Sequence, residues 1–223
     1  MGKIYTETDR DVPRYACTDC SACGSLIGKS LCKVKNRGCC WYFPKFSLVD
    51  IQRMTKAPEG LKVLNRIIDN PNTKIYNYYM QARGFFDEAE YGKYMESGKL
   101  VETDYIEDHT IFFRACPFVK AGQGCTLPPR YRTFVCNFFI CREITEAAKS
   151  YELFQNYEEE RLKYSRWLDW ENESLRHVLS ERNLTLHGNL AEAIQVLQEL
   201  EMSQYEFPYL EPIILDDSWY RGA

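Results

Sequence analysis

Apolar residues recur at helical spacing over much of the chain. Leu48, Ile51 and Met54 lie three residues apart, and Ser47, a residue type that caps helices, precedes them. A second apolar series covers residues 61–68 and ends before an Asn-Pro pair, where a helix is expected to stop. The pattern predicts two consecutive short helices.

The segment that follows predicts more than one kind of element. Weaker helical patterns over residues 73–83 and 85–96 indicate a third and a fourth helix. Residues 99–106 and 110–114 contain β-branched and aromatic side chains, and they predict a small β-hairpin. Residues 1–16 are expected to form an extended lead-in.

The last third of the chain has a longer helical pattern. Residues 142–182 contain neither proline nor glycine, and their apolar positions follow a helical period. They predict one very long helix, or two helices with a break near Asn172. A final helix is expected to start near Asn189, and the tail from Phe207 should be extended. The fold class is therefore mainly α with a small β-hairpin.

Composition and charge narrow the class of protein. Hydrophobic residues make up 45% of the chain, which is enough for a packed core and argues against disorder. A net charge of −4 argues against a nucleic-acid binder. No apolar run approaches the roughly 18 residues of a membrane span, and the polar start does not resemble a signal peptide. A cytoplasmic protein with reduced thiols is expected.

Ten cysteines change this picture. Cys17, Cys20 and Cys23 recur at every third position, a spacing that lets tight turns present several thiolates to one metal. In a reducing compartment such thiols predict metal ligation or redox chemistry before disulfides. One group comprises Cys17, Cys20, Cys23, Cys32, Cys39 and Cys40, and the other comprises Cys116, Cys125, Cys136 and Cys141.

The kind of metal follows from the ligand types. None of the three histidines lies within a cysteine group, so all-thiolate iron–sulfur or zinc sites are expected. The repeated two-residue gaps, without a second paired knuckle, favour an iron–sulfur cluster of the 4Fe-4S type, with zinc as the alternative. Cys116-Pro117 could supply a remote fourth ligand, as a Cys-Pro pair does in bacterial ferredoxins. The predicted metal ligands are Cys17, Cys20, Cys23, Cys39, Cys40, Cys116, Cys125 and Cys136.

Several residues keep two interpretations. Cys32 and Cys141 could be ligands or could pack, and one of the adjacent pair Cys39 and Cys40 could only pack. Arg130 and Arg132 flank the second group and could offset thiolate charge, or they are ordinary surface residues. The basic stretch over residues 29–37 has the same two interpretations, as counter-charge or as a solvated loop.

The order of the cysteines resembles the CxxCxxCC cysteine-cluster family, which is described as a zinc- or iron-chelating domain. The resemblance covers roughly residues 17–141, and it implies a metal site. Two departures concern the exact ligand set, because Gly24 interrupts the first run and Thr133 follows Arg132 where the family has proline. The matching segments are Cys17, Cys20 and Cys23 with Gly38-Cys39-Cys40, then Cys116-Pro117-Phe118, Gly124-Cys125, and Tyr131-Arg132 through Cys136.

These observations leave the function open between classes. Residues 1–141 are expected to form a metal-binding domain, on which the helical residues 142–223 pack. The first hypothesis is an iron–sulfur protein with a redox role, or part of an enzyme that modifies a protein or a small molecule. The alternatives are a zinc-stabilised interaction module, or a methyltransferase, because some relatives of the family resemble flagellin lysine N-methylases. A protein substrate or redox partner is expected, and the apolar C-terminal helices also allow a homo-oligomer.

Overall fold

A computed structural model describes residues 2–18, 25–99 and 101–215. Helices account for 44% of these residues and strands for 16%, so the fold is mainly α with small antiparallel sheets. No helix in these ranges is long and apolar enough to cross a membrane. The α-helices are α1 (Leu48–Thr55), α2 (Pro58–Ile68), α3 (Glu88–Ser97), α4 (Phe134–Phe138), α5 (Arg142–Ala148), α6 (Glu152–Glu181) and α7 (Leu190–Glu199).

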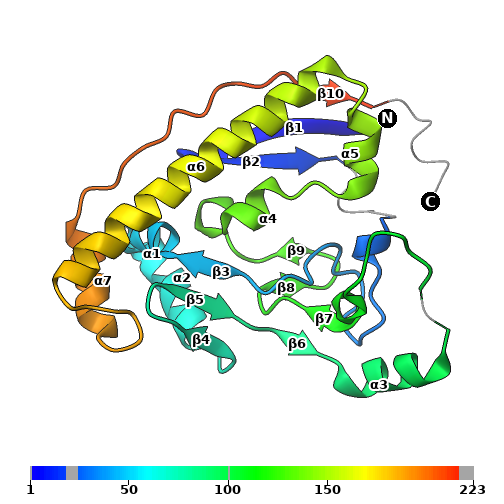
Figure 1. The fold of residues 1–223 in the computed structure, drawn as a ribbon, viewed down its shortest axis with the longest axis horizontal. Coiled ribbons are helices and arrows are strands. Elements are labelled where there is room, and N and C mark those ends of the chain that lie inside the picture. Colours follow the sequence, from blue (N-terminus) through cyan, green and yellow to red (C-terminus); the bar gives the residue numbers. More distant parts are fainter. Residues whose placement is uncertain (1, 19–24, 100, 216–223) are drawn as a thin grey trace.

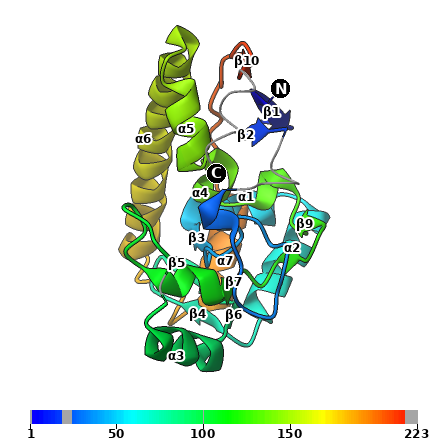
Figure 2. The same cartoon turned by 90° about the vertical axis from the view of Figure 1, so that its right-hand side faces the viewer.

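Helix α6 is the longest element and runs along one side of the molecule, with α5 at its first end and α7 at its last (Figure 1). Figure 2 shows the same helix from the side, with the small sheets and the cysteine loops on one flank of it. Within the described residues, three short 3-10 helices lie in the loops: η2 (Leu26–Gly28), η3 (His109–Phe113) and η4 (Pro129–Tyr131).

The described residues form four antiparallel sheets. The order β10-β1-β2 joins the two ends of the chain, because Ile4 in β1 lies opposite both Cys17 of β2 and Ile213 of β10. A second sheet has the order β3-β5-β4, and two pairs of short strands, β6-β7 and β8-β9, complete the set. The strands are β1 (Lys3–Asp9), β2 (Val12–Cys17), β3 (Lys45–Ser47), β4 (Thr73–Ile75), β5 (Tyr79–Ala82), β6 (Phe85–Phe86), β7 (Arg114–Ala115), β8 (Val119–Lys120), β9 (Gly124–Cys125) and β10 (Ile213–Ile214).

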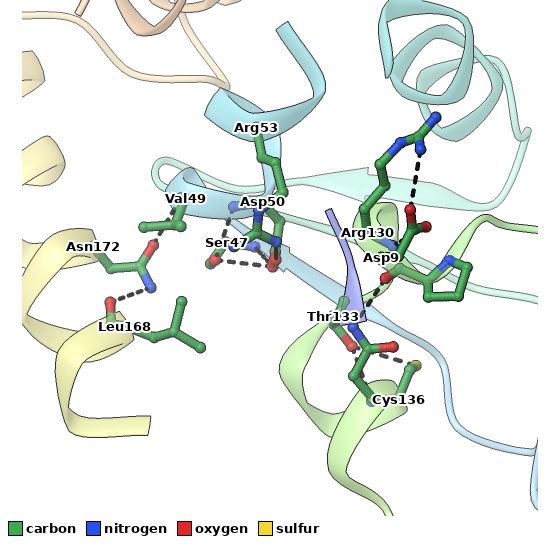
Figure 3. Close-up of polar contacts among 12 residues, drawn as sticks. Asp9, Ser47, Val49, Asp50, Arg53, Arg130, Thr133, Cys136, Leu168 and Asn172 are labelled. Atoms are coloured by element: carbon green, nitrogen blue, oxygen red, sulfur yellow. Dashed lines mark hydrogen bonds and ion pairs between the residues drawn. The ribbon is translucent and has the colours of Figure 1, made fainter. Parts of the chain in front are cut away.

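Helix α1 begins at the predicted cap. Ser47 Oγ accepts from the backbone N–H of Asp50, and the Asp50 carboxylate accepts in return from the Ser47 N–H at 2.9 Å, which completes a capping box. Asn172 of α6 satisfies a further N–H of this helix end, because its Oδ1 accepts from Val49 at 3.0 Å while its Nδ2 donates to Leu168 (Figure 3). The same side chain therefore caps α1 and fixes it against α6.

Two hydrophobic cores hold these elements. The main core contains buried residues from β1, α1, α2, α6 and α7, among them Ile4, Ile51, Ile67, Leu179 and Leu197. A smaller second core is centred on Ile106, Ile111, Phe112 and Phe113, against which side chains of the first cysteine loop pack. The expected division at residue 141 stays a prediction, although both sides of it contribute to the main core.

Three predicted elements are wrong. Residues 73–83 form the hairpin β4–β5 instead of a helix, because β5 pairs with β3 as well as with β4. Residues 99–106 and 110–114 do not form a hairpin. Ile111, Phe112 and Phe113 lie in η3, where burial in the second core replaces strand pairing. Residues 1–16 were expected to be an extended lead-in, and most of them form the paired strands β1 and β2. The structure therefore has more strands than the one small hairpin that the pattern predicted.

The helices agree better with the pattern. The two short helices and the last one are confirmed as α1, α2 and α7. The fourth predicted helix starts only at Glu88, where Asp87 is the N-cap. The long C-terminal pattern does break, but between Ala148 and Glu152, and Asn172 lies inside α6. The Asn172 side chain does not interrupt the helix, because its Nδ2 donates to Leu168 O within α6 while its Oδ1 accepts from Val49 of α1.

Candidate metal centre

Four thiols from distant parts of the sequence come within electrostatic reach of one another. Cys136, Cys40 and Cys125 all act on the thiol of Cys116, and Cys125 and Cys40 act on that of Cys136. The backbone links two of these segments directly, since the N–H of Cys116 donates to the carbonyl oxygen of Cys40 at 2.8 Å. We call Cys40, Cys116, Cys125 and Cys136 the thiol cluster.

Short local structures place these side chains. Cys125 ends β9, which pairs with β8. Gly122 in the turn between these strands and Gly124 at the start of β9 both have positive φ. The N–H of Gly122 donates to Asn36 O at 3.1 Å, so the tip of this hairpin is tied to the first cysteine loop. Cys136 lies in the first turn of α4, where the Thr133 hydroxyl both caps the helix and lies 3.3 Å from the Cys136 sulfur (Figure 3).

Gly84 allows the chain to pass close behind Cys116. A Cβ at this position would lie 2.0 Å from the carbonyl oxygen of Ala115 and 2.7 Å from the nitrogen of Pro117. Both contacts are with backbone atoms, so a side chain could be accommodated only if the peptide segment that carries Cys116 moved. No local pattern predicts this requirement, because Gly84 and Ala115 are 31 positions apart in the sequence.

The environments of the thiols differ. Burial raises the pKa of Cys116 well above its usual range, and the neighbouring thiols raise it further. Loss of hydration also raises the pKa of Cys136 to about 11, although the residue as a whole keeps exposed surface. The pKa of Cys40 is lowered to about 7 by the hydrogen bond with Cys39, with help from Arg132 and Arg37. One thiol is thus ready to lose its proton near neutral pH, and two hold theirs.

The two predicted counter-charges separate in the structure. Arg132 lies near the thiols, where its guanidinium favours the thiolate forms of Cys40 and Cys136. Arg130 instead binds Asp9 at 3.1 Å (Figure 3). It also binds Glu59 at 3.0 Å, so it ties the second cysteine loop to β1 and α2. Only Arg132 therefore has the surroundings that a role beside a metal centre requires.

Arg37 was expected in a solvated or charge-compensating loop, and it is buried, with 2% of its surface exposed. Its Nη2 donates to Ile111 O at 2.7 Å and to Lys29 O at 2.9 Å, which joins the first cysteine loop to η3. Arginine within a glycine- and lysine-rich stretch gives no sign of burial, so the sequence could not distinguish it from its exposed neighbours.

The remaining predicted ligands lie elsewhere or fall outside the described ranges. Cys20 and Cys23 belong to the residues that the structure does not describe. Cys17 ends β2 and packs against the main core, and Cys39 is hydrogen-bonded to Cys40. Of the two undecided cysteines, Cys32 is fully buried, with its sulfur 3.3 Å from Ser30 Oγ.

The other undecided cysteine, Cys141, is followed by a polar link between the two cysteine groups. Cys141 precedes α5, and two residues later the Glu143 carboxylate accepts from the Leu26 N–H at 3.0 Å and from Ser25 Oγ at 2.8 Å. Tyr105 OH donates to the same carboxylate at 3.1 Å. These hydrogen bonds lower the pKa of Glu143 against the opposing effect of its burial. The segment after the first cysteine run is thus fixed beside α5.

The fit to a metal can be judged on donor chemistry and on placement. Four cysteines are a donor set that both zinc and iron–sulfur clusters use. As placed, however, no three His, Cys, Asp or Glu side chains within residues 2–18, 25–99 and 101–215 form a group that could hold a metal ion. The residue types therefore fit a metal, and the thiols would have to converge further on binding.

A groove of about 550 Å³ adjoins the second cysteine loop. It lies between one face of α2 and the segment that follows Cys116, and Arg66 spans its wall by stacking on Phe118 and donating to Thr126 Oγ1 at 2.7 Å. The residues that line it are Lys62, Asn65, Arg66, Asp69, Asn70, Pro117 and Phe118.

No protein-family model, curated protein or solved structure matches this chain. The resemblance to the cysteine-cluster family therefore stays a prediction from the cysteine order, and the function has to be argued from the site itself.

Proposed function

We propose that this chain is a cysteine-ligated metalloprotein whose described centre is formed by Cys40, Cys116, Cys125 and Cys136. The observation that carries the proposal is the meeting of thiols from two segments far apart in sequence, fixed by the hydrogen bond from Cys116 N to Cys40 O. Packing alone gives no reason for thiols of both cysteine loops, Cys40 and Cys136, to share the neighbourhood of Arg132. Cys17, Cys20, Cys23 and Cys39 remain proposed as further ligands on sequence grounds.

An iron–sulfur cluster of the 4Fe-4S type is the first choice of metal, and zinc is the alternative. A cluster of that kind supplies one-electron transfer. Cys40, Cys116, Cys125 and Cys136 would hold it, and their thiols would lose their protons when it binds. A site closed by four thiolates leaves no open coordination position, which favours electron transfer or structure over chemistry at the metal. We therefore propose that the protein exchanges electrons with a redox partner in the cytoplasm.

Metal analysis of anaerobically purified protein tests this function. The protein should be brown and should contain iron and acid-labile sulfide in similar amounts. Cys116→Ser and Cys136→Ser should each lower the metal content, because each removes a thiolate from the cluster. Cys32→Ser is the matched control, since its sulfur contacts Ser30 and Val34, and its metal content should stay near wild type. Colourless protein with stoichiometric zinc would select the zinc alternative, and protein without metal would reject both.

The methyltransferase hypothesis expected a substrate cleft between the C-terminal helices and the cysteine loops. The groove that adjoins Cys116 is lined by α2 and by Pro117 and Phe118, and neither α5 nor α6 contributes to it. The structure thus adds no support to that hypothesis. Calorimetry with S-adenosylmethionine on metal-replete protein tests it directly.

A further inference from the structure

Arg37 is a cation buried without a carboxylate. Within the described residues it forms no ion pair with a carboxylate. Its Nη atoms donate to the backbone carbonyls of Lys29, Gly38 and Ile111, and the Cys32 thiol also hydrogen-bonds the guanidinium. Its Nε is buried and has no hydrogen-bond partner. A charged group removed from water is costly unless an opposite charge or a full set of acceptors compensates it. The protein groups around Arg37 supply only part of that compensation.

The missing anion can be sought among the neighbours of Arg37. The ionisable groups that act on its guanidinium are the thiols of Cys32, Cys40 and Cys39. Cys40 belongs to the thiol cluster, and the indole N–H of Trp41, next along the chain, is a second buried donor without an acceptor. Two unpartnered donors therefore flank the point where the first cysteine loop reaches the cluster. These two N–H groups could donate to the thiolate or sulfide sulfurs of an occupied metal centre.

We propose that Arg37 is a positioning residue that supplies the buried counter-charge of the metal–thiolate centre, and that the occupied centre is therefore net negative. The inference rests on the proposed function. Four thiolates around a divalent metal ion, or around an oxidised four-iron cluster, leave two negative charges uncompensated. Arg37 approaches the cluster from the buried loop and Arg132 from the second loop, so each cysteine loop contributes one cation to the same centre.

A purely structural role makes a different prediction. Arg37 also holds the loop to η3 through its bonds to Lys29 O and Ile111 O, and those bonds need its shape as well as its charge. Arg37→Lys keeps the charge and loses the two-armed geometry, whereas Arg37→Gln keeps a hydrogen-bond donor and loses the charge. Arg130→Gln is the matched control, because Arg130 also has an unpartnered buried Nε but pairs with Asp9 and Glu59.

The experiment measures the reduction potential of the iron–sulfur protein and the retention of metal against a chelator. A nearby cation stabilises the more negative, reduced form, so losing it should lower the potential. Arg37→Gln should favour the oxidised form by about tenfold, about 59 mV for a one-electron couple, and should lose metal about tenfold faster. Arg37→Lys should stay close to wild type in both quantities, even if its melting temperature falls, and Arg130→Gln should not shift the potential.

Equal effects of Arg37→Lys and Arg37→Gln would overturn the counter-charge role, as would a shift in Arg130→Gln of the same size. If the protein holds zinc, chelator competition alone gives the same comparison. If Arg37→Gln does not fold while Arg37→Lys folds and keeps metal, Arg37→Met is refolded in the presence of metal. A requirement for charge predicts a low metal content in Arg37→Met and a content near wild type in Arg37→Lys. Wild-type protein that binds no metal would refute the proposed function itself.

Discussion

Cys40 and Cys136 approach the same cluster in opposite states of protonation. The pKa of Cys40 is lowered to about 7, whereas that of Cys136 is raised to about 11. Metal binding needs thiolates, so the proton that Cys136 holds must leave when a metal enters, and metal affinity should rise with pH. The metal-free protein instead benefits from keeping that proton.

We expect the stability of metal-free protein to fall in alkaline solution through Cys136. A thiol whose pKa rises from 9.0 in the unfolded chain to about 11 in the fold binds its proton more tightly when folded. It therefore stabilises the fold below pH 9, and that contribution is lost as pH rises toward 11. Urea unfolding between pH 8 and 10.5 measures the loss. Cys136→Ser should show a shallower decline than wild type, and parallel curves would contradict the assignment.

The sequence marks candidate ligands one residue at a time, but it does not predict their surroundings. Cysteine spacing is a local signal, so it marked Cys40, Cys116, Cys125 and Cys136 as candidate ligands. Which thiols meet depends on long-range packing, which a spacing does not contain. Arg37 shows the same limit, because a buried and an exposed arginine look alike in a sequence. The separation of Arg132 from Arg130 depended on Asp9 and Glu59, which no local pattern connects to them.

At the scale of elements, the apolar spacing predicted those helices that pack one face against the main core. Helix α1 combines apolar spacing with a capping serine and α2 combines it with a helix-initiating proline, whereas α7 has the apolar spacing without a side-chain cap. The pattern predicted all three. The pattern did not predict the hairpin β4–β5. Strand β5 also pairs with β3, near residue 46, and this long-range pairing overrides a weak helical period. Residues 110–114 have strand-forming side chains, but the second core buries them in η3.

Close packing between elements makes Gly84 a specific requirement of the centre. Gly84→Ala should displace the segment from Ala115 to Pro117, because its Cβ would lie 2.0 Å from a backbone oxygen. We expect a stability loss of about 1–3 kcal/mol, typical of overpacking, together with a lower metal content. Gly60→Ala is the control, since its Cβ would lie 2.2 Å from the backbone oxygen of Met54 in α1, a helix that contains no cysteine.

The two glycine variants separate packing from metal binding. Thermal unfolding should show a loss in both, and metal analysis should show a loss only in Gly84→Ala. A Gly84→Ala protein with full metal content would mean that the Cys116 segment can move without cost to the centre.

At the scale of the whole molecule, the chain forms one structure around two unequal cores. The pairing of β10 with β1 brings residues 213–214 back to the start of the chain, and the main core includes residues from both ends. The second cysteine loop, with Cys116 and Cys125, packs on the main core. The second core includes η2, η3 and the strand β6, and it receives side chains of the first cysteine loop. The cysteine loops contain few regular elements, so a metal is expected to contribute much of their stability.

Removal of the metal should therefore loosen the cysteine loops and spare the rest of the main core. Hydrogen exchange should speed up at the amides that join the cysteine loops, those of Cys116 and Gly122, because their acceptors Cys40 O and Asn36 O lie in the other loop. For metal at 100 times its dissociation constant, protection should fall by up to about 100-fold on chelation. The amide of Leu186, which donates to Asn77 O at 2.9 Å in the main core, should change little. Equal acceleration at Leu186 would show instead that the metal holds the entire fold together, since the two cores would then unfold as one unit.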